Sequence, residues 1–107
     1  MVAVAPDLLI ASRIEASLGA AGHEVELAPS LSEASDLERT QLLLADLDRE
    51  SVEAVVGLGV PVLGFYSHTD VETRQRAESA GVDLVVPRSR LVREMHELVE
   101  RALAAAR

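Results

Sequence analysis

The sequence has 107 residues, 49% of them hydrophobic, a formal net charge of −8 and no cysteine. We expect a single domain over residues 1–107, without disulfides or thiolate metal sites, and the negative charge argues against nucleic-acid binding. No apolar run approaches the roughly 18 residues of a membrane span, and the N-terminus lacks the pattern of a signal peptide, so we expect a soluble cytoplasmic protein. All ten basic residues are arginines, which excludes any mechanism that needs a lysine ammonium.

Five apolar runs recur about every 20 residues with helical patterns between them, which is typical of βα units and a parallel sheet. The second run is short and half polar, which indicates an edge strand. The third is continuously apolar, as expected of a central strand buried on both faces. The predicted strands cover residues 2–5, 25–27, 42–45, 61–66 and 84–86.

Two of the predicted helices have a clear apolar face. The first should end at Gly22, a residue suited to a left-handed position after a helix. Its apolar face comprises Ile10, Ile14, Leu18 and Ala21. The last helix has an apolar stripe with Glu and Arg opposite. That stripe comprises Leu91, Met95, Leu98, Val99 and Ala102.

Start and stop signals predict three further helices. Two capping boxes open the second and fourth of the five, the fourth ends at Gly81, and a brief third helix covers about 50–56. The boxes are Ser30 with Glu33 and Thr69 with Glu72. The predicted fold class is therefore α/β: a (βα)5, doubly wound, five-stranded parallel sheet.

Polar side chains should gather beyond the carboxyl ends of the strands, where open parallel sheets bind ligands. They are Asp7, Asp46, Asp48, Tyr66, Ser67, His68, Arg88 and Arg90. Simpler roles are open to them: Asp7 and Asp48 as helix caps, and Asp46 as a cap or an Arg partner. Phe65 should enter the core and Tyr66 the opposite face, either toward the site edge or half-buried with a wet hydroxyl.

Other chemistries have no motif behind them. His23, His68 and His96 lack metal-ligand spacing, and the sequence contains neither a glycine-rich nucleotide motif nor a Ser-His-Asp arrangement. We therefore expect a protein that is not an enzyme.

Three features together resemble the receiver (CheY-like) domains of bacterial response regulators. They are the third strand ending in Asp46, the run Pro61-Val62-Leu63 of the fourth strand, and Ala80-Gly81-Val82-Asp83 before the fifth. The resemblance covers nearly the whole chain. It implies the flavodoxin-like receiver fold, with Asp46 at the phosphoacceptor position of a two-component phosphorelay.

The resemblance also shows what is missing. Pro6 and Asp7 stand at the acidic pair that normally holds Mg²⁺, so one carboxylate is lost. Asp48 stands where a backbone carbonyl would complete the metal shell, so Asp7, Asp46 and Asp48 imply at most a thin Mg²⁺ site. Tyr66 stands in place of the Thr or Ser whose hydroxyl contacts the phosphoryl group in the family, although Ser67 is adjacent.

The lysine after the fifth strand is also absent. Val86-Pro87-Arg88 stands in place of the family's Lys-Pro. The planar guanidinium of Arg88 is not equivalent to an ammonium point charge, and phosphoryl transfer depends on well-placed cations.

These losses predict a stand-alone pseudo-receiver, a signalling protein-interaction module that works without Asp phosphorylation. The resemblance implies a protein partner, or a homodimer, on the surface of the fourth helix, fifth strand and fifth helix. Tyr66, Ser67, Arg88 and Arg90 are candidates for switching or interaction, although Arg90 and Arg93 could simply form ion pairs with Glu94 and Glu97. Two alternatives remain: an active phosphoacceptor that uses Asp46, Asp7 and Arg88, and a small flavodoxin-like ligand-binding protein or enzyme.

Overall fold

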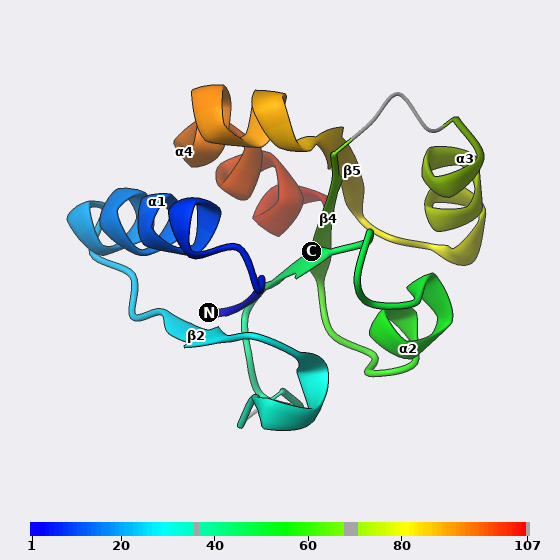
Figure 1. The fold of residues 1–107 in the computed structure, drawn as a ribbon, viewed down its shortest axis with the longest axis horizontal. Coiled ribbons are helices and arrows are strands. Elements are labelled where there is room, and N and C mark those ends of the chain that lie inside the picture. Colours follow the sequence, from blue (N-terminus) through cyan, green and yellow to red (C-terminus); the bar gives the residue numbers. More distant parts are fainter. Residues whose placement is uncertain (36, 68–70, 107) are drawn as a thin grey trace.

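Five parallel strands form one sheet in the order β2-β1-β3-β4-β5 (Figure 1). The computed structural model describes residues 1–35, 37–67 and 71–106. The strands are β1 (Val2–Val4), β2 (Glu26–Ala28), β3 (Leu43–Asp46), β4 (Val62–Tyr66) and β5 (Leu84–Pro87). The prediction of a five-stranded parallel sheet is confirmed, with the half-polar strand at an edge and the apolar third strand in the centre.

Helices cover both faces of this sheet, so the doubly wound arrangement is confirmed as well. One face packs against α1 and α4 and the other against α2 and α3 (Figure 1). The helices are α1 (Leu8–Ala20), α2 (Val52–Val56), α3 (Val71–Ala80) and α4 (Arg88–Ala105), with a 3₁₀ turn, η1 (Leu31–Glu33).

Two apolar layers hold the helices against the sheet. The layer under α1 and α4 contains Phe65, and all five residues of the predicted α4 stripe are buried in it. Ile10, Ile14 and Leu18 of α1 are buried there too. Ala21 is exposed, contrary to the prediction, because α1 has already ended and Ala21 occupies its C-cap.

The predicted second helix is wrong. Residues 31–33 form only a 3₁₀ turn, and Ser30 makes no side-chain cap. The Ser30 hydroxyl instead shares a hydrogen bond with the Ser32 hydroxyl at 3.0 Å, and the Glu33 N–H donates to the Ser30 carbonyl. The predicted capping box therefore does not form, and the Ser30 hydroxyl is used in a local side-chain contact instead. Thr69, which starts the other predicted capping box, lies outside the described residues, as does His68.

The run Ala80-Gly81-Val82-Asp83 has a structural explanation. Gly81 adopts φ +98° after α3, and the Val82 N–H donates to the Ala77 carbonyl, closing the helix. The Asp83 carboxylate then accepts a hydrogen bond of 2.8 Å from the Val62 N–H. This run therefore ends a helix and aligns the start of β4 with β5.

Two Gly→Ala substitutions should change stability in opposite directions. Gly81→Ala should lower the free energy of unfolding by about 1–2 kcal/mol, because its backbone is left-handed. Gly19→Ala, in α1, should raise it by about 0.5–1 kcal/mol, because an added Cβ meets nothing within 4 Å. Urea denaturation measures both, and an equal effect of the two variants would contradict the assignment.

Candidate functional site

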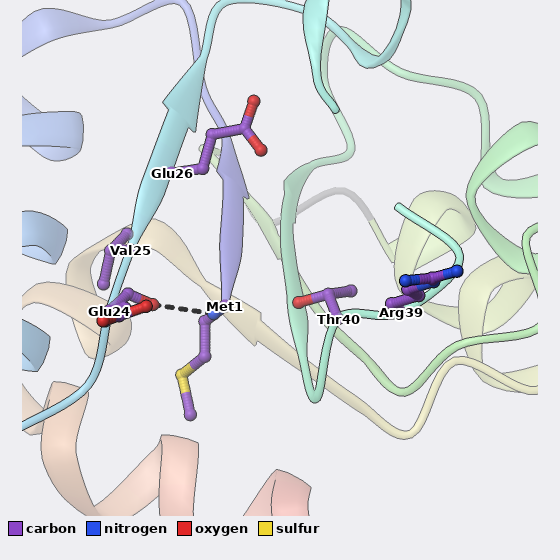
Figure 2. Close-up of a pocket in the computed structure, with 6 residues that line it drawn as sticks. All are labelled: Met1, Glu24, Val25, Glu26, Arg39 and Thr40. Atoms are coloured by element: carbon purple, nitrogen blue, oxygen red, sulfur yellow. Dashed lines mark hydrogen bonds between the residues drawn. The ribbon is translucent and has the colours of Figure 1, made fainter. Parts of the chain in front are cut away.

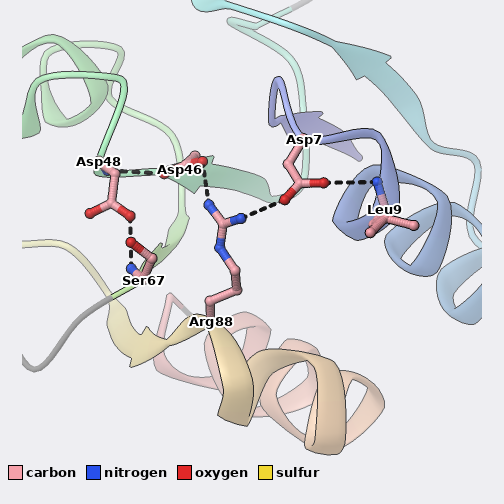
Figure 3. Close-up of polar contacts among 6 residues, drawn as sticks. All are labelled: Asp7, Leu9, Asp46, Asp48, Ser67 and Arg88. Carbon is pink, nitrogen blue, oxygen red and sulfur yellow. Dashed lines mark hydrogen bonds and ion pairs between the residues drawn. The ribbon is translucent and has the colours of Figure 1, made fainter.

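Three residues far apart in the sequence meet at the carboxyl edge of the sheet. Arg88 reaches between two carboxylates: its Nη1 donates to Asp7 Oδ2 and its Nη2 to Asp46 Oδ2, each at 2.8 Å (Figure 3). Asp7 follows β1, Asp46 ends β3 and Arg88 follows β5. The sheet order therefore converts three separate strand ends into one ion-paired cluster, as expected of an open parallel sheet.

Asp46 is the buried member of this cluster. Its residue is 1% exposed, and it is the only buried polar or charged residue in the described part of the chain. Its Oδ1 accepts a hydrogen bond of 2.9 Å from the Asp48 N–H, and its Oδ2 binds Arg88. Both carboxylate oxygens therefore already have partners.

Burial and neighbouring groups act on the pKa of Asp46 in opposite directions. Burial raises the pKa above its ordinary value of 3.8, while the Asp48 N–H and then the Arg88 guanidinium lower it. The net direction is upward. The ion pair therefore offsets only part of the cost of placing a carboxylate at the end of a central strand.

Asp7 has two roles at once. It is the N-cap of α1, where its Oδ1 accepts a hydrogen bond of 2.9 Å from the Leu9 N–H. Its other oxygen binds Arg88. The predicted capping role is therefore present. Because the Asp7 side chain is 41% exposed, its ion pair is more screened than the buried pair of Asp46.

Asp48 does not join the ion-paired cluster. Its Oδ2 accepts a hydrogen bond of 2.7 Å from the Ser67 N–H, and its carboxylate points toward Ser67 in Figure 3. This contact ties the turn after β3 to the end of β4.

Tyr66 is only 4% exposed, so the alternative of a half-buried Tyr66 is wrong. Phe65 is buried, as predicted.

The Arg88 guanidinium also packs over an aromatic ring. Its Cζ lies 5.8 Å from the centroid of the Phe65 ring, within the range of a cation–π interaction. The Arg88 Nε is buried and has no hydrogen-bond partner in the described structure. The two carboxylates and the ring therefore fix the position of the guanidinium. In that position the Nε–H group makes no hydrogen bond.

The other arginines of this region lie on the helix. The helix α4 begins directly after β5, so Arg88, Arg90 and Arg93 all belong to it. Arg90 lies 3.5 Å and Arg93 3.1 Å from Glu94. Of the two acidic partners considered from the sequence, Glu94 takes both arginines.

The site does not fit Mg²⁺. Mg²⁺ needs near-octahedral oxygen ligands at about 2.0–2.1 Å, yet a guanidinium lies between Asp7 and Asp46 and the Asp48 carboxylate binds elsewhere. Among the described residues, no three Asp, Glu, His or Cys side chains form a group that could hold a metal ion.

A pocket lies at the opposite end of the strands, where they begin. It has a volume of about 460 Å³ and its lining includes the N-terminal ammonium group, which donates to the Glu24 carbonyl at 2.7 Å (Figure 2). The lining residues are Met1, Glu24, Val25, Glu26, Arg39 and Thr40. This pocket is remote from Arg88 and does not extend the ion-paired cluster.

Solved structures resemble this chain closely in fold. NtrX from Brucella abortus, solved in complex with ADP, has a TM-score of 0.83 at 18% identity over 98% of this chain and 27% of that chain. FixJ-N has a TM-score of 0.75 at 20% identity over 96% and 91% of the two chains. A response regulator from Thermotoga maritima has a TM-score of 0.69 at 16% identity over 92% and 95%.

These neighbours confirm the predicted receiver (CheY-like, flavodoxin-like) fold. The chain spans only about a quarter of the NtrX chain that it matches. No protein-family model and no curated protein matches the sequence. None of the described helices is both long and apolar enough to cross a membrane.

All three members of the cluster, Asp7, Asp46 and Arg88, were candidates from the sequence. They were expected together in the alternative of an active phosphoacceptor, with Asp7 also as a metal ligand or a helix cap, but not as one ion-paired cluster. That one guanidinium binds both carboxylates depends on the distance between two strand ends, and no local pattern reports that distance. The position of Arg88 over Phe65 has no sequence signal either.

Removing the guanidinium should raise the pKa of Asp46 further. In Arg88→Met the larger of the two positive charges that lower this pKa is gone while the burial stays, so a carboxyl ¹³C NMR titration should give a higher pKa than in the wild type. Because the folded-state pKa is raised above the ordinary value of 3.8, the stability contribution of Asp46 is complete below that value and is lost as the pH rises through the folded-state pKa. Arg90→Met, which lacks contact with Asp46, is the control. An unchanged or lower pKa in Arg88→Met would contradict the assignment.

Proposed function

We propose that this chain is a pseudo-receiver: a cytoplasmic signalling module that acts by binding other proteins and works without phosphorylation of Asp46. The observation that carries the proposal is the Arg88 guanidinium between Asp7 and Asp46, 2.8 Å from each. The receiver fold supports a role in signalling, and the ion-paired cluster supports the loss of the phosphoryl chemistry.

The chemistry of an acyl phosphate explains why this observation matters. To be phosphorylated, Asp46 must present a free carboxylate oxygen to the donor, and cations must neutralise the phosphoryl oxygens. Here both oxygens of Asp46 are hydrogen-bonded and its residue is 1% exposed. The Arg88 guanidinium is already shared by two carboxylates, and the chain has no lysine.

Incubation with Mg²⁺ and acetyl phosphate tests the proposal. We expect intact-mass spectrometry to detect no phosphoryl adduct on the wild-type protein, because the Asp46 carboxylate is buried and each of its oxygens already accepts a hydrogen bond. An active receiver treated in parallel shows that the donor works.

The alternative of an active phosphoacceptor makes the opposite prediction. It draws its support from Asp46 at the end of the central strand with a cation beside it. A stoichiometric adduct that Asp46→Asn abolishes and Asp48→Asn retains would establish that alternative and overturn the pseudo-receiver.

A partner needs a surface, and charge favours the one formed by α3, β5 and α4. Residues 71–105 contain six arginines and six acidic residues, whereas residues 1–67 contain three arginines and eleven acidic residues. The net negative charge therefore resides in the first two-thirds of the chain. Two copies, or an acidic partner, meet less repulsion on the α3-β5-α4 surface than elsewhere.

If the partner is a second copy, reversing one charge on this surface should weaken the dimer. Arg93, on α4, has a 68% exposed side chain. Analytical ultracentrifugation should show a lower dimer fraction for Arg93→Glu than for the wild type, because the substitution adds like charge to the contact. Arg13→Glu on the exposed side of α1 makes the same change in net charge elsewhere. A monomeric wild type at the highest concentration would contradict the homodimer and leave a different protein as the partner.

A further inference from the structure

The start of α4 is a weak helix terminus. Its N-cap is Pro87, which makes no side-chain cap, and the first turn has no acidic residue. Two arginines, Arg88 and Arg90, instead lie at the positive end of the helix dipole, which disfavours cations. Little within the helix itself therefore stabilises this turn.

The same segment is separated from the rest of α4 by a break in the backbone. Glu94 has φ −125° and ψ 31°, which is not helical. Arg90 and Arg93 pair with Glu94 itself, so neither contact links the segment to β1 or β3. Residues 88–93 thus form a short helical segment that depends on tertiary contacts.

Leu91, which is fully buried in the layer under α1 and α4, anchors this segment to the core. The contacts of Arg88 add a polar anchor at its first residue. Its two Nη atoms bind Asp7, which follows β1, and Asp46, which ends β3, each at 2.8 Å. Its guanidinium also lies over the ring of Phe65 on β4. One side chain therefore connects the segment to three strands.

A metal ion and the guanidinium compete for the same carboxylates. A divalent cation that bridged Asp7 and Asp46 would have to take the two oxygens that Arg88 now occupies. It would also meet the repulsion of a fixed positive charge at close range, which is strong in a partly buried site.

We infer that the Arg88 guanidinium is a built-in cation that takes the place of a divalent metal ion between Asp7 and Asp46, excludes such an ion from this edge of the sheet, and fixes the first segment of α4 without one. This inference deepens the proposed pseudo-receiver, on which its significance for signalling rests. Arg88 thereby holds residues 88–93 in position, and these residues lie on the proposed partner surface.

Paramagnetic Mn²⁺ is the probe for the metal site. In wild-type ¹H–¹⁵N spectra, Mn²⁺ should leave the amides of Leu9, Asp48 and Ser67 no more broadened than other amides beside surface carboxylates. In Arg88→Met the same three amides should lose most of their intensity, because the two carboxylates are released for the metal. Arg90→Met removes the same charge from the same helical segment and leaves the ion pairs of Asp7 and Asp46 in place. It should therefore behave like the wild type.

Hydrogen exchange is the second measurement, and it needs no metal. The amides of residues 91–93 should exchange faster in Arg88→Met than in Arg90→Met or the wild type, while those beyond Glu94 should be unchanged. Equal exchange in Arg88→Met and Arg90→Met would overturn the anchoring role of Arg88.

The metal experiment can also fail in two clear ways. Selective broadening of Leu9, Asp48 and Ser67 in the wild type would overturn metal exclusion outright, whatever happens in any variant. A folded Arg88→Met that still shows no selective broadening would overturn the role of Arg88 in that exclusion. Should Arg88→Met fail to fold, Arg88→Gln removes the charge while keeping a hydrogen-bonding group, and the same criteria apply to it.

These experiments use no phosphodonor and no partner protein. Selective Mn²⁺ binding by a wild type that takes up no phosphoryl group would overturn this inference and leave the pseudo-receiver intact. A phosphoryl adduct on Asp46 would overturn the pseudo-receiver itself.

Discussion

A buried carboxylate that needs a positive charge is the constraint on which the carboxyl edge of this sheet depends. Asp46 ends the central strand, is 1% exposed and has a raised pKa because of that burial. A charge in such a place is stable only when it is paired and hydrogen-bonded. The Asp48 N–H and Arg88 supply those two interactions. In the position where Arg88 pairs with Asp46, its guanidinium also meets Asp7 and the Phe65 ring.

The position of Arg88 links several parts of the fold that are distant in sequence. Its contact with Asp7 connects the start of α1 to the start of α4, while Asp48 connects the turn after β3 to the end of β4. In this arrangement charge neutralisation is internal to the protein. A receiver-like edge held in this way needs no exchangeable ion to keep its geometry, which is the physical basis for proposing a module that works through binding.

Much of the fold was accessible from local patterns. The alternation of apolar runs and helical periodicity predicted the parallel sheet, and the α4 stripe was right at every position, because burial and periodicity are properties of neighbouring residues. The second helix failed because Ser30 and Glu33 match a cap without enough following structure to propagate a helix. Arg88 begins α4 directly after the fifth strand, because Pro87 both ends β5 and serves as the N-cap.

The sequence alone determined which groups were present: three aspartates and two arginines after the strands, no lysine, and one carboxylate where the resembling family has two. It could not determine which of them touch, because side chains 81 and 42 residues apart meet only through strand order and register. The tertiary structure decided that one guanidinium would serve two carboxylates and that Asp48 would turn toward Ser67 instead. The physical reason is that ion pairing depends on distances of a few ångströms and on burial, and both arise only when the sheet has assembled.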